Sequence, residues 1–231
     1  YADKPLVIDA EGFQKLKKAF QIAEDKQVLL YDIMTERFEI TTLLQRELST
    51  IPSVFGELED GSPSQPAITK ESVHHFFKEV SGVPLVRPDW FFDIEKEGTG
   101  IVDVTTHLVD LIQWEAFPEQ ILDTTEVQVY DSKIWATGLS LEEFQRVTQK
   151  PQLTQELKKY KVGDKLEVMS NGEFSYSLRG KHAKVSVIWN FQAPEGTGDT
   201  HFSLMRGTKA NLIIRQGEAE GFKPVLYVQL L

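Results

Sequence analysis

The sequence predicts an α+β fold, an open and mostly antiparallel β-sheet with helices on one face. Most of the helical periodicity lies before Trp114, and from Asp164 onward the chain is a series of short extended segments separated by glycine-containing turns. Neighbouring strands joined by short turns pair antiparallel, and helices then cover one face of the sheet. We find no internal repeat and no low-complexity linker, so residues 1–231 are predicted to form one domain.

The helical patterns are distributed along the chain with loops between them. Helix-like spacing of apolar residues occurs at residues 9–25, 35–49, 70–80, about 103–114, 140–150 and 152–160. Asp9 is a suitable N-cap for the first helix, and Ser140 with Glu143 three residues later forms a capping box for the helix at 140–150. Two short apolar runs, residues 27–32 and 53–58, have the length of strands. The N-terminal part therefore predicts helices that alternate with brief strands.

Extended segments dominate the C-terminal part. Each is bounded by turn residues, and the predicted strands are residues 125–130, 165–169, 173–179, 184–192, 201–205, 210–215 and 225–230. The dipeptide Asn171-Gly172 is a strong hairpin signal between two of them. These segments predict an antiparallel meander.

The composition limits the kinds of partner. The chain has 231 residues, a formal net charge of -10 and a pI near 5.1. It therefore has no basic excess to neutralise the phosphates of nucleic acid or an anionic membrane surface. It contains no cysteine and no apolar run long enough to span a membrane, and the residues after Tyr1 do not have the charged-then-apolar pattern of a signal peptide. Small molecules and other proteins remain as partners, and we expect a soluble protein, cytoplasmic by default.

The stretch 98–114, GTGIVDVTTHLVDLIQW, contains the strongest candidate for chemistry. Asp103 and His107 are four residues apart at the start of the predicted helix, so both side chains project from one face. A carboxylate can orient or polarise a substrate group, and an imidazole exchanges protons near neutral pH. The same residues also fit a structural helix with Asp103 near its N-terminus and a satisfied His107. The stretch alone leaves both interpretations open.

Two further patterns are weaker signals. Gly98-Thr99-Gly100 precedes a helix as in a dinucleotide-binding turn, but Asp103 occupies the third glycine position of that fingerprint, which favours a flexible turn. Glu71, His75 and Glu79 recur every four residues and would line one helical face as metal ligands. A solvated helix has the same pattern, so no metal site is predicted.

Tryptophans near the central stretch are candidates for substrate contact. Trp90 and Trp114 flank the Asp103 and His107 pair and would serve as platforms for a sugar ring, although tryptophans also fill cores and interfaces. The sequence has no Gly-x-Ser-x-Gly elbow and no phosphate-binding Gly-Lys-Ser/Thr loop. Hydrolase and nucleotide-phosphatase functions are therefore without support.

In their order along the chain, these motifs resemble the catalytic half of the glucose-fructose oxidoreductase and inositol dehydrogenase family. The chain opens with Asp3-Lys4-Pro5, a helix, a strand and a second helix, and then reaches the glycine-rich turn, Asp103-x-x-x-His107 and Asp110. That family usually has Glu-Lys-Pro where its nucleotide domain joins the second domain, and Asp-x-x-x-His in the catalytic helix. Asp3 replaces the usual Glu here, which is a mild change.

The resemblance implies a fold, a cofactor and catalytic roles. The implied fold is that of the C-terminal domain of glyceraldehyde-3-phosphate dehydrogenase. NAD or NADP would be bound mainly by a preceding Rossmann domain that this chain lacks, so we expect a hundred or more residues upstream and an inactive isolated chain. Lys4 and Pro5 would reach the nicotinamide, Asp103 would bind a substrate hydroxyl, and His107 would exchange its proton during hydride transfer to or from a sugar or polyol.

The remaining predictions concern substrate contacts and assembly. The candidate substrate-binding residues are Trp90, Trp114, His75 and Arg37. A non-enzymatic carbohydrate-binding or oligomerisation module with the same fold is the alternative, with Asp103 and His107 as structural residues. In either case an open sheet with one bare face predicts a homo-oligomer that pairs through that face.

Overall fold

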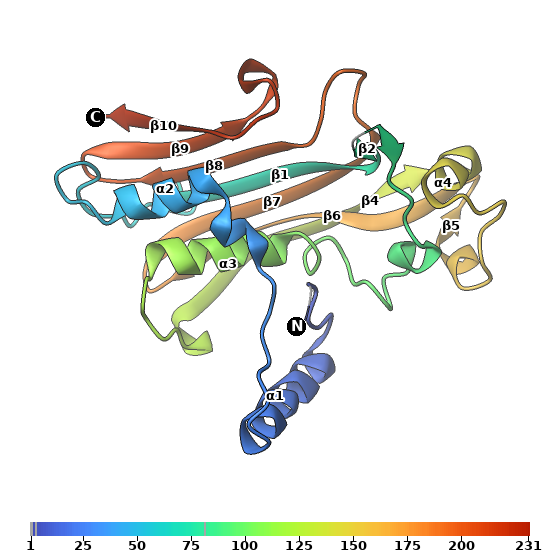
Figure 1. The fold of residues 1–231 in the computed structure, drawn as a ribbon, viewed down its shortest axis with the longest axis horizontal. Helices are drawn as coiled ribbons and strands as arrows, with labels where there is room; N and C mark the ends of the chain where they lie inside the picture. The colour runs from blue at the N-terminus through green and yellow to red at the C-terminus, as the bar shows by residue number, and fades with distance from the viewer. Residues whose placement is uncertain (1, 3, 81) are drawn as a thin grey trace.

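The computed structural model describes residue 2 and residues 4–80 and 82–231, so Asp3 of the predicted opening motif lies outside the described residues. Its centre is an eight-stranded sheet in the order β10-β9-β8-β1-β7-β6-β4, with β5 paired to β6 (Figure 1). The strands are β1 (Ile68–Phe77), β4 (Val127–Leu139), β5 (Lys161–Val162), β6 (Lys165–Leu178), β7 (Lys181–Gln192), β8 (Thr200–Arg206), β9 (Ala210–Gln216) and β10 (Val225–Leu230). A separate pair joins β2 (Glu79–Val80) and β3 (Val83–Pro84). The predicted α+β class is confirmed.

Strand β1 lies in the middle of the sheet, between β8 and β7, and is parallel to β7 but antiparallel to β8. The helix predicted for residues 70–80 is therefore wrong. Alternate side chains of this segment, including Ile68, Lys70 and Phe76, are buried beneath the helices, which is the two-residue period of a strand. Charged residues and histidines in this segment, such as Lys70 and His75, hide the strand period because they are buried through ion pairs and not through apolar side chains.

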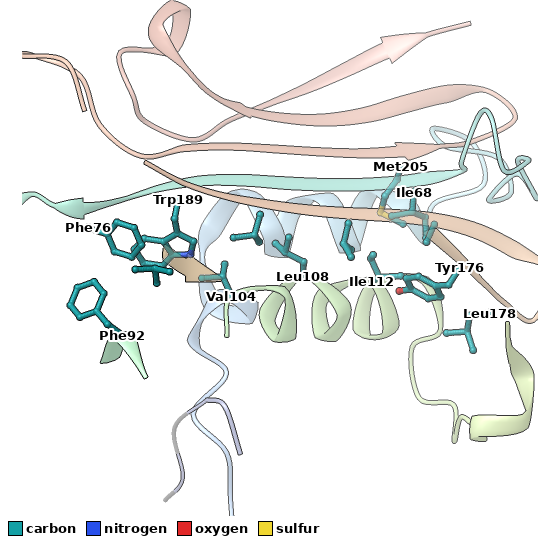
Figure 2. Close-up of a cluster of buried hydrophobic side chains, with 14 of the residues drawn as sticks. Ile68, Phe76, Phe92, Val104, Leu108, Ile112, Tyr176, Leu178, Trp189 and Met205 are labelled. Carbon is teal, nitrogen blue, oxygen red and sulfur yellow. The ribbon is translucent and has the colours of Figure 1, made fainter. Parts of the chain in front are cut away.

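Helices α2 (Ile40–Ser49) and α3 (Thr105–Ala116) cover one face of the sheet (Figure 1). Val104, Leu108 and Ile112 lie along one side of α3 and point towards the strands, where they meet Trp189, Ile68 and other core residues (Figure 2). This spacing of four residues places one apolar stripe against the sheet. The helical layer and the sheet thus enclose the main hydrophobic core.

Helix α1 (Ala10–Asp25) begins at its predicted N-cap, where the Asp9 carboxylate accepts a hydrogen bond from the Gly12 amide at 2.6 Å. It stands away from the sheet (Figure 1), and none of its residues is buried. Phe13 and Phe20 of its predicted apolar stripe are 44% and 47% exposed. No helix in the described part of the chain is long and apolar enough to cross a membrane.

Helix α4 (Leu141–Thr148) has the predicted capping box between Ser140 and Glu143. The helix predicted for residues 35–49 is present as α2, but it begins later than predicted: a 3-10 turn (Thr35–Phe38) precedes it, and Glu39 is its N-cap. Other local predictions were wrong. Residues 27–32 and 53–58 are not strands, since each makes only an isolated bridge, and of 152–160 only Leu157–Tyr160 is helical, as a 3-10 turn.

The hairpin predicted at Asn171-Gly172 is also wrong, because both residues lie inside β6. The Asn171 side chain accepts a hydrogen bond from the Trp189 amide at 2.6 Å and donates to the Thr137 hydroxyl at 2.8 Å, next to an irregularity in β4. The turn between β6 and β7 instead uses Arg179 and Gly180, both at positive φ. Asn171 therefore bridges three strands.

Candidate functional site

A cavity of about 370 Å³ lies between the helical layer and the sheet. Its lining comes from the N-terminal segment, the 3-10 turn Thr35–Phe38, helices α2 and α3, strands β1, β7, β8 and β9, and loops that carry Lys78, Leu85, Arg87 and Pro224. The polar and charged residues at its border are Lys4, Glu36, Glu39, Thr41, Thr42, Ser72, His74, Lys78, Arg87, His107, His201 and Gln216. Trp189 and leucines of α3 supply apolar walls. A concave site with apolar walls and converging polar groups is a typical small-molecule site.

Two of the three predicted catalytic residues border this cavity. Helix α3 begins at Thr105, so Asp103 lies in the turn that precedes it and not within its first turn as predicted. The Asp103 carboxylate is buried and forms an ion pair with the Lys4 ammonium group. Lys4 lines the cavity, whereas Asp103 lies behind it. The structure therefore brings the start of the chain and the central stretch together.

His107 reaches the cavity from the first turn of α3, with 12% of its side chain exposed. Its Nδ1 atom lies 2.8 Å from Oε2 of Glu36, which is ion-pair distance, although the angle falls outside hydrogen-bond geometry. Partial burial raises the pKa of Glu36, but its interaction with the His107 ring outweighs this effect, so the pKa lies below its ordinary value. Glu36 is a charged neighbour of His107.

Asp199 lies outside the cavity lining but contacts two residues of that lining, His74 and Lys78. Its carboxylate lies 2.7 Å from the Lys78 ammonium and 3.5 Å from Nδ1 of His74. Burial raises the pKa of Asp199, but hydrogen bonds from His74, Lys78 and His75 outweigh burial and lower it. His74 also accepts or donates a 2.7 Å hydrogen bond with Ser72 and stacks on Trp189 at 4.9 Å. His74 is therefore fixed at the cavity wall.

His75 was predicted as a substrate-binding residue, but it does not line the cavity. Because successive side chains of β1 alternate between the two faces of the sheet, His74 points to the helical side and His75 to the other. His75 instead pairs with Asp199 at 2.9 Å. The four-residue metal pattern of Glu71, His75 and Glu79 is lost for the same reason, and no group of metal ligands exists among the described residues.

His201 is a cavity residue that the sequence did not reveal. Burial, together with the nearby charges of Lys70 and His74, lowers the pKa of His201 to about 4. At neutral pH it is therefore an uncharged imidazole. Its position on β8, directly opposite Ser72 of β1, places it on the helical side of the sheet.

The other predicted substrate contacts lie away from the cavity. Trp90 is 48% exposed, and Trp114 packs under the Arg46 guanidinium at 4.6 Å. Arg37 forms a two-point ion pair with Asp110, with Nε to Oδ2 at 2.7 Å, and lines a separate surface depression next to Trp114. Trp189, which was not singled out, is the tryptophan that borders the cavity.

The glycine-rich turn before α3 has a packing role. A Cβ atom at Gly100 would overlap the carbonyl oxygen of Ser170, and the Gly100 amide donates to the Met169 carbonyl at 2.9 Å. Gly98 has φ of +82°, a conformation that favours glycine. The turn is thus docked on β6, which explains its glycines without a nucleotide.

Comparison with known proteins identifies the family. The family described as "Putative oxidoreductase C terminal domain" matches residues 44–231. This chain belongs to the oxidoreductase C-terminal domain family. The membership supports the resemblance drawn from the sequence at the level of fold and family. No curated protein matches the chain in sequence.

Solved structures contain the same C-terminal domain fold. A "putative oxidoreductase" from Parabacteroides merdae ATCC 43184 is 54% identical with a TM-score of 0.96, over 99% of this chain and 52% of that one. GenD2 from gentamicin A biosynthesis, solved with NAD, is 15% identical with a TM-score of 0.57, over 93% and 46%. The super-repressor mutant of Gal80p from Saccharomyces cerevisiae is 15% identical with a TM-score of 0.55, over 99% and 52%. This oxidoreductase C-terminal domain therefore spans about half the length of each.

Proposed function

We propose that this chain is the substrate-binding and proton-transfer part of an NAD- or NADP-dependent oxidoreductase that acts on a sugar or polyol. One observation carries the proposal. Lys4 and His107, which come from distant parts of the sequence, border one cavity, and each lies against a carboxylate, Asp103 and Glu36 respectively. In this proposal His107 is the acid–base group, and Lys4 is a positive charge at the border of the same cavity.

Oxidation of a secondary alcohol by hydride loss needs a base for the hydroxyl proton, and ketone reduction needs the same group as an acid. His107 supplies that group. Because Nδ1 faces Glu36, Nε2 is the ring atom free to exchange a proton with substrate. The Lys4 ammonium, held by Asp103, would stabilise the negative charge that develops on the substrate oxygen. A direct contact of Asp103 with a substrate hydroxyl stays a prediction.

A nicotinamide, when bound, supplies the hydride acceptor or donor for this chemistry. In this proposal Lys4, which borders the cavity, and Pro5 beside it would contact the nicotinamide. The phosphates of the nucleotide need a glycine-rich turn at a helix N-terminus, and the turn at Gly98-Thr99-Gly100 is used for packing on β6. We therefore assign most of the nucleotide site to a segment upstream of this chain.

The uncovered face of α1 supports an upstream domain. Phe13 and Phe20 lie on this face, and beyond the helix Val28, Leu29 and Tyr31 are 62%, 77% and 55% exposed. Large contiguous apolar surface usually marks an interface. A domain that precedes the chain would cover this surface and bring the nucleotide to the Lys4 side of the cavity.

The function is tested in the natural full-length protein, by following nicotinamide reduction with a panel of sugars and polyols. We expect His107→Asn and Lys4→Met to lower kcat/KM by a factor of about 100 or more, since general acid–base catalysis contributes about 10²–10⁴. Lys15→Met is the matched control, because Lys15 is exposed on α1 and pairs only with Glu11 among the described residues. Normal turnover by both site variants would contradict the assignment.

The alternative is a non-enzymatic carbohydrate-binding or assembly module. Sugar binding that is unaffected by NAD or NADP, and unchanged in His107→Asn, would favour it. We also propose a homo-oligomer that pairs through the sheet face opposite α2 and α3. Light scattering tests this proposal, and a monomer would contradict it.

A further inference from the structure

The charged groups around the cavity are matched in pairs. Each carboxylate there has a protein partner: Glu36 has His107, Glu39 has the hydroxyl and amide groups at the start of α2, Asp103 has Lys4, and Asp199 has Lys78 and two histidines. Both lysines at the border are therefore already neutralised by a carboxylate.

Arg87 also borders the cavity, but it is not part of any of these ion pairs. Its Nε donates to the Phe76 carbonyl at 3.0 Å, and its Nη2 donates to the His75 carbonyl at 3.3 Å. Within the part of the chain that the structure describes, no carboxylate lies at ion-pair distance from the guanidinium, and Nη1 makes no hydrogen bond. Arginine is always protonated in proteins, and a partly buried charge is normally paired.

Aromatic rings fix the orientation of Arg87. The guanidinium carbon lies 4.6 Å from the centre of the Phe91 ring and 4.9 Å from that of Trp189. Burial lowers the pKa of Arg87, while the charges of three carboxylates, Asp103, Asp199 and Glu97, act in the opposite direction without forming an ion pair with it. Arg87 thus borders the cavity with its guanidinium held by two carbonyls and two rings, and its Nη1 has no hydrogen-bond partner among the described residues.

We propose that Arg87 binds the carboxylate of the substrate, and that the substrate is an acidic sugar or polyol such as a uronate or aldonate. This inference rests on the proposed function, because it names the substrate class of the same site. One unpaired positive charge matches one carboxylate. A phosphate dianion would need a second unpaired cation, and Lys4 and Lys78 are both engaged.

The rest of the cavity fits such a molecule. Its volume of about 370 Å³ suits one monosaccharide-sized ligand, since small-molecule sites occupy about 300–1,000 Å³. Neutral His201 and the Ser72 hydroxyl supply hydrogen-bonding groups without charge, which is what sugar hydroxyls need. The acid group would then lie at Arg87 and the reacting carbon at His107.

The test is calorimetric titration of the natural full-length protein with matched probes: glucose and glucuronate, galactose and galacturonate, gluconate, and glucose 6-phosphate. We expect at least one acid to bind about tenfold more tightly than its neutral partner, as a charge-assisted hydrogen bond allows. Arg87→Gln should remove this preference, because it should weaken binding of the acid about tenfold more than binding of the matching neutral sugar. Arg146→Gln is the control, because Arg146 also lies over two aromatic rings, Phe77 and Phe191, but does not border the cavity.

If Arg87→Gln does not fold, Arg87→Lys keeps the charge and should keep part of the preference. Four results would each overturn the inference. They are equal binding of acids and neutral sugars by the unmodified protein, a preference for acids that survives Arg87→Gln, binding of glucose 6-phosphate tighter than that of the acids, and no binding of any acid. An Arg87-dependent preference without any reduction of NAD or NADP would instead overturn the proposed function and leave this site standing. His107-dependent turnover of neutral sugars but of no acid would overturn the Arg87 inference and leave the proposed function standing.

Discussion

A buried ion pair connects the helical layer to the sheet. Removing one partner alone should destabilise the fold more than removing both. Lys70 of β1 and Glu115 of α3 are fully buried with their charged atoms 2.8 Å apart. Lys70→Met leaves the carboxylate without a counter-charge in the core, which costs about 3–5 kcal/mol of unfolding free energy. Lys70→Met with Glu115→Leu removes that penalty. Because Ser203 and Gln45 still bond each other at 2.8 Å, the double variant should recover most of the loss.

The stability of the Lys70→Met variant should also depend on pH through the Glu115 carboxyl group. Burial raises the pKa of Glu115, so the folded protein holds the proton at a pH where the unfolded chain has lost it. The unfolded value is about 4.3, and without Lys70 the stability of the single variant should fall as pH rises above it. Denaturant unfolding curves of the natural full-length protein measure both effects. A loss below about 1 kcal/mol in Lys70→Met, or a double variant as unstable as the single one, would refute the reasoning.

Two further predictions concern packing and acid stability. Gly100→Ala should destabilise the fold by about 1–3 kcal/mol in denaturant unfolding, because its Cβ would overlap Ser170. Gly198→Ala is the control and should be nearly neutral, because Gly198 has room for a Cβ. Equal destabilisation by the two substitutions would contradict the close approach of Gly100 to Ser170. His201 has a folded pKa of about 4 against 6.5 unfolded, so the unfolded chain takes the proton first and stability falls by about 3 kcal/mol as pH drops through this window. His201→Gln should flatten that slope in unfolding curves measured between the two values, and an unchanged slope would argue against a buried neutral His201.

Local signals in the sequence predicted much of the fold. The Asp9 cap, the Ser140 capping box and strand β10 follow from nearest-neighbour chemistry, and each is present in the structure. Strand β1 does not follow from its local sequence, because the burial of its charged residues depends on distant partners. A lysine such as Lys70 is expected to face solvent, and only the ion pair with Glu115 explains why it is buried. Long-range pairing of this kind leaves no mark on a short window of sequence.

The candidate site was predicted in part for the same reason. Lys4 and His107 were identified by motif order, and the structure places both at one cavity. His74 was passed over in favour of its neighbour His75, because choosing between them requires the strand register. Arg87 stands out only when every carboxylate has been matched with its partner, which needs the three-dimensional arrangement.

The central claim is that this chain is the substrate half of a site completed by a nicotinamide nucleotide. The most direct test is calorimetric titration of the natural full-length protein with NAD and with NADP, in oxidised and reduced forms. We expect saturable one-to-one binding of at least one of them, weakened in Lys4→Met because Lys4 lies on the side of the cavity assigned to the nicotinamide. Binding of none of them would contradict the oxidoreductase assignment and leave a sugar-binding or assembly domain.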